Sequence, residues 1–376
     1  MIRITIPQRA EGQCSVRGMK CEPLPVVRVG IVGLGARGLT LLRLMLLVPG
    51  ARVTALCNIS ASAIDTACEA LAIDPDGVAR YSGDDGYLKL CRSDDVDLVV
   101  ISTDWNAHTE IAVAAMQAGK HVAVEVPAAL TMDDLWRLVD TSEQTRRHCT
   151  LLENCCYDEE VVAAIRAIRQ GTIGEVVHAE GRYYHHLDGR WSQWRLDLNR
   201  SLRGDLYPTH ELGPLCMALD INRSDRLSSL VSMDSNAFSG PGVYERETGT
   251  EAPDYRNGDH TMTFLRTALG KTILLQHDVI TPQPYSRSLH IIGTKGDITT
   301  SSDNGTDPEL ICSSFRSVHD PMTYEMLRRL IACINQGQPI DIDVYDLASW
   351  CAVIPLSLLS IEAGNEPVAF PDFMRQ

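Results

Sequence analysis

The chain has few basic residues for its size. It carries 34 Lys and Arg against 49 Asp and Glu, which gives a formal net charge of −15 at pH 7. A field of this sign repels nucleic acid and anionic membrane surfaces, so we expect neither as a partner. A neutral small molecule or a glycan is compatible with this charge, and this is the substrate class that we expect.

Patterns typical of membrane, exported and zinc proteins are also missing. We find no run approaching the about 18 apolar residues of a membrane helix, and the first 25 residues lack the apolar core of a secretion signal. None of the 12 cysteines forms a C-x-x-C pair, and His185-His186 has no carboxylate or cysteine partner at ligand spacing. We therefore expect reduced thiols, no metal ion and a cytoplasmic location.

The length and the order of the patterns predict two domains. A chain of 376 residues is too long for one compact core. In the first part, apolar strand patterns alternate with helical ones, which is typical of a doubly wound parallel α/β sheet. Beyond Tyr157, several strands follow without helices between them, which predicts an α+β domain with a large open, mostly antiparallel sheet. We predict a flexible N-terminal arm (1–24), a Rossmann domain (25–150) and an α+β domain (151–376), leaving open whether the last helices pack back on the Rossmann domain.

The individual elements follow from these patterns. We expect strands at 26–32, 53–57, 97–102 and 121–126 in the first domain, and at 175–186, 260–270, 271–280 and 288–299 in the second. Helices are expected at 109–118 and 161–170, and beginning near Thr209, Met322 and Asp346. Residues 235–257 are polar and glycine-rich, so we expect a long exposed loop there.

A glycine-rich turn follows the first strand. The run VVRVGIV leads into G-L-G-A-R-G and then into the apolar helical stretch LTLLRLMLLV. Strand, G-x-G-x-x-G and helix in this order are the fingerprint of dinucleotide binding, whereas a degenerate Rossmann fold with an empty site is the plain alternative. The predicted residues of this turn are Gly33, Leu34, Gly35, Ala36, Arg37 and Gly38.

Further cofactor contacts are expected at the ends of the next strands. Asn58 stands where such domains usually hold an acidic residue for the ribose hydroxyls, and it lacks the charge that repels a 2′-phosphate. The choice between NAD and NADP therefore stays open at this point. The other expected cofactor contacts are Ile59, Thr103, Trp105, His108, Glu125 and Asn154.

The motif Glu125-Val126-Pro127 ends the last strand of the predicted Rossmann domain. A Rossmann domain followed by an open antiparallel sheet resembles the Gfo/Idh/MocA oxidoreductase family. Its members usually have Glu-Lys-Pro here, and the lysine helps to move a proton off the substrate hydroxyl. Val126 has no such chemistry, so either the chain is not catalytic or other residues transfer the proton.

Longer stretches carry a more specific resemblance. They are VEVPAALT (124–131), LLENCCY (151–157), LYPTHELGP (206–214) and QHDVITPQPYSR (276–287), together with IIGTKGD and the closing VAFPDF. From about Val26 to the C-terminus the chain resembles glycoside hydrolase family 109, which contains NAD-dependent α-N-acetylgalactosaminidases. The resemblance implies tightly bound, recycled NAD and hydrolysis without net oxidation. In that route, hydride leaves sugar C3, loss of the C2 proton expels the C1 substituent, water adds and the hydride returns.

This chemistry needs groups that move protons near neutral pH. We expect His210 at the first turn of a helix, where the dipole favours the neutral imidazole, and assign it to the C3 hydroxyl. Tyr207 and Tyr157 are candidates for removing the C2 proton or protonating the leaving group, in an order that the sequence leaves open. Glu125 is expected to orient one of them or the sugar. The plain alternatives are a capping histidine, packing tyrosines and a buried structural carboxylate.

Several further residues are candidates for sugar binding. Trp194 and Arg195 lie in GRWSQWRLD, where an aromatic platform for a pyranose and a core anchor are both plausible readings. Tyr285 and Arg287 either bind sugar hydroxyls or brace the sheet. The full set of expected substrate contacts is Tyr157, Trp194, Arg195, Tyr207, His210, Tyr285 and Arg287.

Departures from the family keep other functions in view. Glu211 stands where the family usually has glycine, and it either alters His210, reshapes the pocket or points into solvent. A sugar or cyclitol dehydrogenase is the second hypothesis, and a non-enzymatic sugar or dinucleotide sensor is the third. Since a broad sheet needs one face covered, we also expect a homodimer through the sheet of the second domain. The sugar, its aglycone and the oligomeric state stay undetermined by the sequence.

Overall fold

The computed structural model describes residues 1–376 except 188, 302–316, 318 and 376. The chain forms two compact units. We call the first the parallel-sheet unit; it comprises Gln8–Tyr157 and Pro308–Ala348. We call the second the mixed-sheet unit; it comprises Met1–Pro7, Asp158–Asp307 and Ser349–Gln376. This division follows neither the predicted arm boundary nor a single cut near residue 150.

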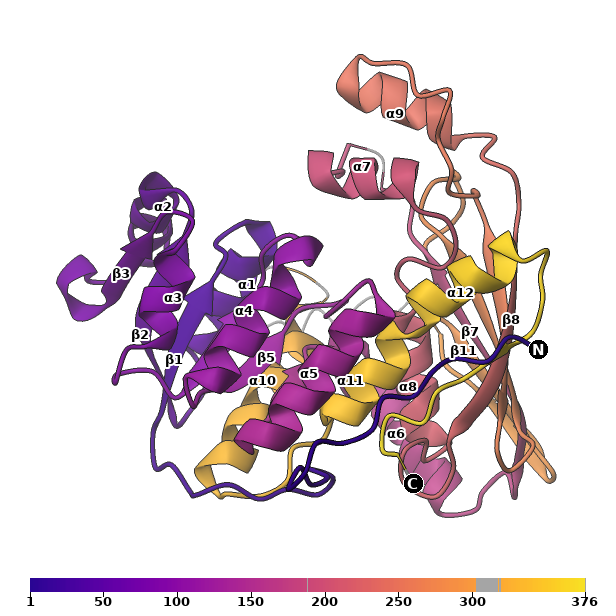
Figure 1. Cartoon of the computed structure of the whole chain (residues 1–376), viewed down its shortest axis with the longest axis horizontal. Coiled ribbons are helices and arrows are strands. Elements are labelled where there is room, and N and C mark those ends of the chain that lie inside the picture. Colours follow the sequence, from indigo (N-terminus) through magenta and orange to yellow (C-terminus); the bar gives the residue numbers. More distant parts are fainter. Residues whose placement is uncertain (188, 302–316, 318, 376) are drawn as a thin grey trace. The chain divides into compact units, whose positions relative to one another are not determined.

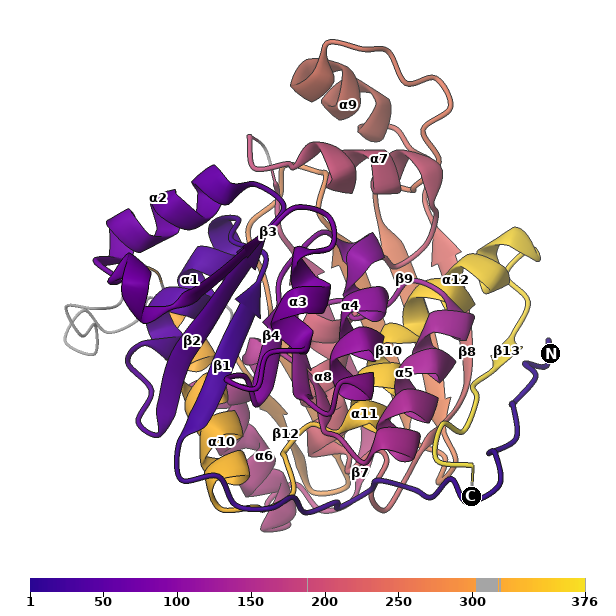
Figure 2. The ribbon, with the colours of Figure 1, turned by 60° about the vertical axis from the view of Figure 1, so that its left-hand side comes forward.

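The parallel-sheet unit has the predicted doubly wound fold. Its six strands all run parallel, in the order β3-β2-β1-β4-β5-β6 (Figures 1 and 2). The central strands β4 and β5 are buried at every residue, as their continuous apolar runs predict for a sheet that is covered on both faces. The strands are β1 (Val27–Val32), β2 (Ala51–Asn58), β3 (Ala79–Ser82), β4 (Leu98–Ile101), β5 (His121–Val124) and β6 (Cys149–Leu151).

Helix α1 shows how the helices of this unit pack on the sheet. On α1 (Ala36–Met45), Leu41, Leu42 and Leu44 are fully buried and pack with residues of β1 and of α10 (Asp320–Asn335). The predicted helix after β4 begins at Trp105, four residues earlier than expected. The remaining helical elements are α2 (Ala61–Leu71), η1 (Pro75–Gly77), α3 (Gly86–Cys91), α4 (Trp105–Gln117), α5 (Met132–Thr145) and η2 (Asn154–Tyr157).

The mixed-sheet unit contains a seven-stranded sheet in the order β12-β11-β7-β10-β9-β8-β13. Neighbouring strands run antiparallel except β7 and β10, so the predicted mostly antiparallel sheet is confirmed. The strands are β7 (Val176–Tyr184), β8 (Leu227–Asp234), β9 (Thr261–Thr267), β10 (Thr272–Asp278), β11 (Leu289–Gly293), β12 (Gly296–Thr299) and β13 (Val368–Ala369).

Helices of the mixed-sheet unit cover one face of this sheet. Helix α8 (Thr209–Ala218) packs against β7, and α12 (Val353–Glu362) packs against β8. Helix α6 (Glu159–Arg169) contacts α8. Because α8 begins at Thr209, the predicted helix start is confirmed.

The expected loop at 235–257 is wrong in part, because it contains α9 (Gly240–Thr248). This helix packs on α7 (Gln193–Ser201) through a small apolar cluster that includes Leu196, Tyr244 and Tyr255. Its signals were present: a proline in the first turn and Gly249 at the end, with a φ of +73°. We predicted a loop because glycines lie at both ends of this short helix.

Residues 1–24 make specific contacts rather than forming a free arm. In the mixed-sheet unit, the Ile2 backbone N–H donates to Pro367 O at 2.8 Å. In the parallel-sheet unit, Arg9 Nη2 lies 2.8 Å from Glu143 Oε1 on α5. The Val16 backbone N–H donates to the hydroxyl of Tyr345, and Val16 is buried. Apolar and charged residues scattered through a segment without periodicity gave no sign of these contacts.

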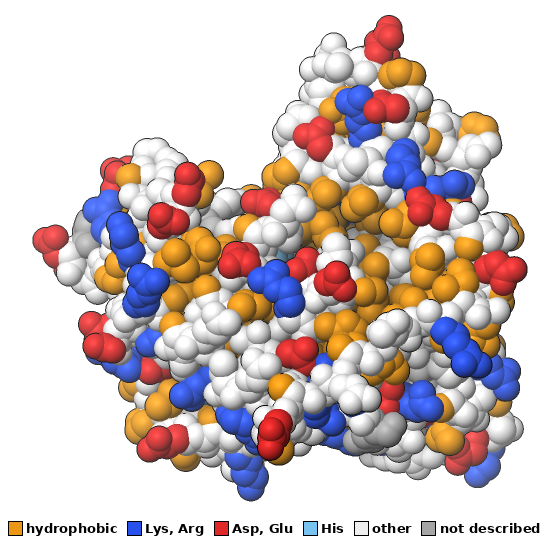
Figure 3. Space-filling model, viewed as in Figure 1, with side chains coloured by type: hydrophobic (Ala, Val, Ile, Leu, Met, Phe, Trp, Pro, Cys, Tyr) orange, Lys and Arg blue, Asp and Glu red, His pale blue; other side chains and the backbone are white. Residues whose placement is uncertain are grey.

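One helical stretch qualifies by length and composition as a membrane span, contrary to our expectation that no run came near. It covers Val344–Glu362, with a mean hydropathy of 1.6, and consists of α11 (Val344–Cys351) and α12. However, 83% of its most apolar window is buried inside the protein, which is also the burial of a core helix. On the face shown in Figure 3, acidic and basic side chains are interspersed rather than gathered by sign.

Candidate active site

The glycine-rich turn of the parallel-sheet unit is shaped for a diphosphate. Gly33 has a φ of +94°, and a Cβ atom there would stand 2.5 Å from the backbone oxygen of Ser102. A Cβ atom on Gly38 would clash with the backbone oxygen of Gly33. At Gly35, by contrast, no described atom lies within 4 Å of the Cβ position. Two glycines therefore allow close packing of strand, turn and helix, and the third leaves the backbone open to a ligand.

Helix α1 begins directly at this turn. Its N-cap residue is Gly35, which offers no side chain, and its first turn contains no acidic residue. The first N–H groups of a helix have no partners within the helix and carry its positive dipole end. The open face of Gly35 and these N–H groups therefore fit the pyrophosphate of a dinucleotide.

Three predicted cofactor residues come together through a residue that we did not predict. Arg37 Nε donates to Glu125 Oε1 at 2.7 Å, and its Nη1 lies 3.4 Å from the hydroxyl of Thr323 on α10. The same hydroxyl accepts a hydrogen bond from Asn154 Nδ2 at 2.9 Å. Thr323 is fully buried. It lies 286 positions after Arg37, and no local pattern marks it.

His108 joins two loops at the carboxyl edge of the parallel sheet. It lies in the first turn of α4 and is fully buried. One ring nitrogen, Nδ1, lies 2.8 Å from Pro127 O, and the other, Nε2, lies 3.2 Å from Thr103 O. Burial lowers the pKa of His108, which favours the neutral ring. The neutral ring carries one N–H and donates to one of the two carbonyl oxygens, so it lies between the loop after β4 and the segment after β5, beside Glu125.

The other predicted cofactor residues occupy the same edge. Asn58 is the last residue of β2, and its Oδ1 accepts the backbone N–H of Ser60 at 3.0 Å. Ile59 is 76% exposed, whereas Trp105 is buried. The polar atom of Asn58 is thus held in place directly beyond the carboxyl end of its strand, where parallel sheets bind ligands.

Tyr157 lies at the end of η2 and has a charged neighbour. Its hydroxyl donates to Asp341 Oδ2 at 3.3 Å, and Arg329 on α10 binds both oxygens of the same carboxylate. Burial, followed by the negative charge of Asp341, raises the pKa of Tyr157 well above its ordinary value. The phenol is therefore held protonated in this arrangement.

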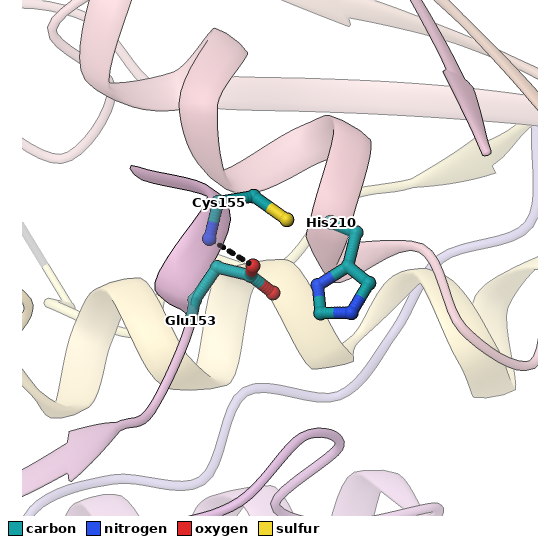
Figure 4. Close-up of side chains that lie close together, drawn as sticks. All are labelled: Glu153, Cys155 and His210. Carbon is teal, nitrogen blue, oxygen red and sulfur yellow. Dashed lines mark hydrogen bonds between the residues drawn. The ribbon is translucent and has the colours of Figure 1, made fainter. Parts of the chain in front are cut away.

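Glu153 precedes η2 and is fully buried. Its Oε1 accepts the backbone N–H of Cys155 at 3.1 Å (Figure 4). This bond closes the turn that carries Asn154 and Tyr157. The two adjacent cysteines, Cys155 and Cys156, are both buried.

In the mixed-sheet unit, three aromatic rings pack together where α8 begins. The Tyr207 and His210 rings stand at 90° with centroids 4.8 Å apart. Tyr183 of β7 lies 5.1 Å from His210 and 5.5 Å from Tyr207, centroid to centroid. Figure 4 shows His210 projecting from the first turn of α8, as its sequence position predicts. Edge-to-face packing of this kind fixes ring orientation and contributes about 0.5–1.5 kcal/mol per pair.

Two arginines extend this cluster. Arg195 of α7 places its guanidinium carbon 4.8 Å from the Tyr207 ring centroid and 5.8 Å from that of Trp191. Arg287 lies over Tyr285 at 5.8 Å, and its Nη2 is 3.7 Å from Asp158 Oδ2. A cation above a phenol ring is attracted by the ring face and stabilises negative charge that develops on the oxygen.

His185 also belongs to this cluster, because it contacts both Tyr183 and Tyr285. Tyr183 and His185 are joined by a hydrogen bond of 2.9 Å between the hydroxyl and Nδ1, and the His185 ring lies 5.1 Å from that of Tyr285. The structure therefore brings Arg195, Tyr207, His210 and Tyr285 together around Tyr183. Trp194 lies beside Arg195 on α7 and is half-buried.

Glu211 does not point into solvent. It is buried, and its Cβ lies so close to β7 that a Cβ atom on Gly181 would stand 2.7 Å away from it. The family's usual glycine would leave this place empty. Gly181 and Glu211 therefore fit one another across the contact between β7 and α8.

A buried acid–base pair lies behind the aromatic cluster. Asp205 Oδ1 accepts the Tyr207 backbone N–H at 3.3 Å and lies 3.9 Å from His277 Nδ1. The His277 ring stacks on Tyr183 with centroids 6.0 Å apart. Burial raises the pKa of Asp205 to about 7 and lowers the pKa of His277 to about 3. We missed both residues, although Asp205 immediately precedes the motif that we singled out.

Two family models together match nearly the whole chain. The model described as glycosyl hydrolase 109, C-terminal domain, matches residues 157–305 and 311–376. The model described as oxidoreductase family, NAD-binding Rossmann fold, matches residues 27–152. The turn at Gly33–Gly38 lies within the second match and has the geometry that this description requires.

Relatives and solved structures agree with these matches. Glycosyl hydrolase family 109 protein 1 of Phocaeicola vulgatus is 41% identical over all of this chain and 89% of its own length. The family 109 protein of Porphyromonas gingivalis is 40% identical over all of this chain and 90% of its own. The fold is similar to that of myo-inositol dehydrogenase from Lactobacillus casei in complex with NAD(H) and myo-inositol, with a TM-score of 0.70 and 19% identity over 93% of this chain and 99% of that one. The fold is also similar to that of an oxidoreductase domain protein from Kribbella flavida, with a TM-score of 0.75 and 17% identity. That similarity covers 92% of this chain and 100% of the other. The chain therefore belongs to glycosyl hydrolase family 109, and it is a glycosidase with an NAD-binding Rossmann domain.

Proposed function

We propose that this glycosidase removes terminal α-linked N-acetylgalactosamine by oxidation at sugar C3, elimination across C2 and C1, addition of water and reduction. The observation that carries the proposal is the packing of Tyr207 and His210 against Tyr183 under the guanidinium of Arg195. Val126 supplies no proton-transfer group, so this aromatic cluster takes that part. The identity of the sugar rests on the family resemblance.

NAD, when bound, supplies the hydride acceptor and donor at C3. The turn at Gly33–Gly38 and the first turn of α1 hold its pyrophosphate, and Asn58 is placed for the adenosine ribose. We propose that the chain retains NAD between turnovers, since the overall hydrolysis leaves the cofactor in its starting oxidation state. The pair of Arg37 and Glu125 braces this turn from the β5 side.

His210 accepts the proton of the C3 hydroxyl in this proposal. Its ring is oriented by Tyr207 and Tyr183, so the basic nitrogen has a defined direction. Tyr207 and Tyr157 divide the two remaining proton transfers, one at C2 and one at the leaving oxygen. Arg195 stabilises charge on Tyr207, whereas Tyr157 is held as a neutral phenol beside Asp341. Glu125 keeps Arg37 in place rather than reacting itself.

The test uses purified protein with p-nitrophenyl α-N-acetylgalactosaminide in deuterated water. We expect nitrophenol release, deuterium at C2 of the sugar, and no accumulation of NADH. Release without deuterium at C2 would refute the elimination route. NADH accumulation without nitrophenol release would mean that the protein is a dehydrogenase. If this substrate is not cleaved but an α-N-acetylglucosaminide or a plain α-galactoside is, the proposed sugar is wrong.

The same assay distinguishes the roles of Tyr157 and Tyr207 as base at C2 and acid at the leaving oxygen. Tyr157→Phe and Tyr207→Phe variants are compared on the nitrophenyl substrate and on a glycoside with a poor leaving group. The variant that loses C2 exchange on both substrates identifies the base. The variant that is impaired only with the poor leaving group identifies the acid.

We also propose that the enzyme is a homodimer through the outer face of its mixed sheet. Phe264 of β9 is 50% exposed and stands in register between Val231 of β8 and Leu274 of β10. The next outward pair on these strands, Met233 and Met262, is also exposed. A contiguous apolar patch on a sheet face marks an interaction surface, and a second copy presents a patch of the same kind.

We propose a cytoplasmic location. The basis is the 12 cysteines, of which Cys57, Cys91 and Cys216 are among those fully buried as thiols. Fractionation of cells that produce the full-length protein tests this, and recovery in the periplasmic or culture fraction would refute it.

A further inference from the structure

A hollow at the amino edge of the parallel sheet has three cationic side chains and two carboxylates in its lining. Its volume is about 190 Å³, and its lining includes Arg28, Lys120, His121 and Arg147. These residues stand at or just before the starts of β1, β5 and β6. The Gly33–Gly38 turn follows the other end of the six-residue strand β1, roughly 20 Å away along the strand. This amino-edge hollow is therefore separate from the cofactor site.

Two carboxylates line the hollow, those of Asp97 and Glu22. Both oxygens of Asp97 are taken by Arg28, at 2.9 Å from Nε and 2.6 Å from Nη2. Glu22 is the other carboxylate of the lining, and it is exposed. Neither Lys120 nor Arg147 forms an ion pair within the described part of the chain.

Three kinds of donor are left over in the hollow. The Arg147 Nε atom is buried and has no hydrogen-bond partner among the described residues. Lys120 Nζ donates one hydrogen bond, to Ser93 O at 2.7 Å, and its ammonium group has three N–H bonds. His121 Nδ1 accepts the His148 backbone N–H at 3.1 Å, so the proton of the neutral ring is on Nε2. That second nitrogen makes no hydrogen bond to any described residue.

Arg147 acts electrostatically on two histidines, His121 and His148. Burial lowers the pKa of His121 to about 3 and that of His148 to about 4, and in both cases the charge of Arg147 lowers it further. His121 is buried, but it lines the hollow. A small anion can exchange its hydration shell for protein contacts where cationic side chains and N–H donors without protein acceptors lie close together.

We propose that the amino-edge hollow binds a small tetrahedral oxyanion, a phosphate or the phosphate group of a monoester, through Arg147, Lys120 and His121. Donor groups of three side chains, the adjacent Lys120 and His121 and the separate Arg147, match the several terminal oxygens of a phosphate better than the two of a carboxylate. Arg147 provides the planar, always-charged donor set that is suited to phosphate. The ligand stabilises the parallel-sheet unit and is independent of the glycosidase reaction.

The experiment is a thermal melt of the full-length enzyme saturated with NAD, which keeps phosphate off the cofactor turn. Inorganic phosphate, glycerol phosphate and acetate are each titrated at constant pH and ionic strength. We expect both phosphates to raise the melting temperature in a saturable manner and acetate to have no such effect. Saturable stabilisation by acetate alone would overturn the assignment to a tetrahedral anion.

Arg147→Gln is the matched variant, and Arg92→Gln is its control, since Arg92 is an exposed arginine of the same unit that is not part of the lining. Loss of the Arg147 charge should weaken phosphate binding roughly tenfold or more, whereas Arg92→Gln should bind as the wild type does. Equal stabilisation of wild type and Arg147→Gln would place the phosphate elsewhere and refute the proposal.

A second readout does not depend on stability. In protein labelled with ¹⁵N-histidine, phosphate should shift the Nε2 signal of His121, which is assigned by its loss in His121→Gln. A signal that does not move at phosphate concentrations that stabilise the protein would remove His121 from the site. Activity on the glycoside is not used, so failure of the glycosidase proposal and failure of this one are distinguishable.

Discussion

The ring of Tyr207 stands perpendicular to that of His210, with 4.8 Å between the centroids. The two residues are three positions apart across the start of α8, one before the helix and one in its first turn. Neither ring can turn freely, because Tyr183 packs against both. A phenol and an imidazole are thereby held in a fixed relation, which a reaction with several proton transfers requires.

His210→Ala should lower kcat by roughly 10²–10⁴, the usual contribution of a positioned acid or base. NAD binding should persist, because the cofactor turn lies in the other unit of the chain. Steady-state kinetics and a fluorescence titration with NAD measure the two effects. His290→Ala, on the half-exposed side chain of a β11 histidine, is the control and should leave kcat unchanged. Undiminished turnover in His210→Ala would remove His210 from the mechanism.

Two glycine substitutions should separate binding from folding. At Gly35 the backbone φ is −69° and no described atom lies within 4 Å of the Cβ position, so Gly35→Ala should fold with wild-type stability. It should still weaken NAD binding, because the methyl group occupies the face that is open to the pyrophosphate. Gly38→Ala should instead destabilise the fold, since its methyl group meets the Gly33 backbone oxygen. Calorimetric titration and chemical unfolding measure both, and unchanged NAD affinity in Gly35→Ala would contradict the assigned site.

Asp205 should make stability fall as pH rises. Its folded-state pKa is raised to about 7, so between about pH 4 and 7 the folded protein holds a proton that the unfolded chain has lost. The folded state is then favoured at low pH, and this stabilisation is lost as pH approaches 7, by at most about 4 kcal/mol. Asp205→Asn should remove this contribution while keeping the acceptor for the Tyr207 N–H, so its free energy of unfolding should rise with pH relative to that of the wild type. Urea unfolding at a series of pH values measures it.

The control for this measurement is Asp84→Asn, on an exposed carboxylate of the parallel-sheet unit. Its slope with pH should equal that of the wild type between pH 4 and 7. If Asp205→Asn and the wild type show the same slope, Asp205 is ionised throughout this range. Buried His277 acts in the opposite sense, because its lowered pKa gives stability that is lost as pH falls below about 6.5.

Phe264→Glu should convert the proposed dimer to monomer. The substitution puts a charge in the centre of the exposed apolar patch on β8, β9 and β10, where a partner would have to desolvate it. Light scattering after size exclusion gives the mass, 41.4 kDa for one chain. Leu269→Glu, on the exposed turn between β9 and β10, is the matched control and should remain dimeric. A wild-type protein that runs as a monomer would refute the proposal directly.

Much of the fold was predictable because its signals are local. Alternating apolar runs and helical periods placed β1, β4 and β5 correctly, and the strand-to-glycine-turn pattern placed Gly33 and Gly38 where packing requires them. Helix α9 was missed because it is short and bounded by glycines, so its composition is that of a loop. The contacts of the N-terminal arm were missed because their partners, such as Tyr345 and Pro367, are distant in the sequence.

The Rossmann turn, the helix start beside His210 and the family could be predicted without coordinates, since each depends on a contiguous run of residues. Three relationships emerge only in the folded chain: Thr323 joins Arg37 to Asn154, Asp205 faces His277 behind Tyr207, and Arg147 lines a hollow with His121. These relationships join segments up to 286 positions apart. Their energy comes from burial and from partners that meet only in the folded chain, so no local pattern encodes them.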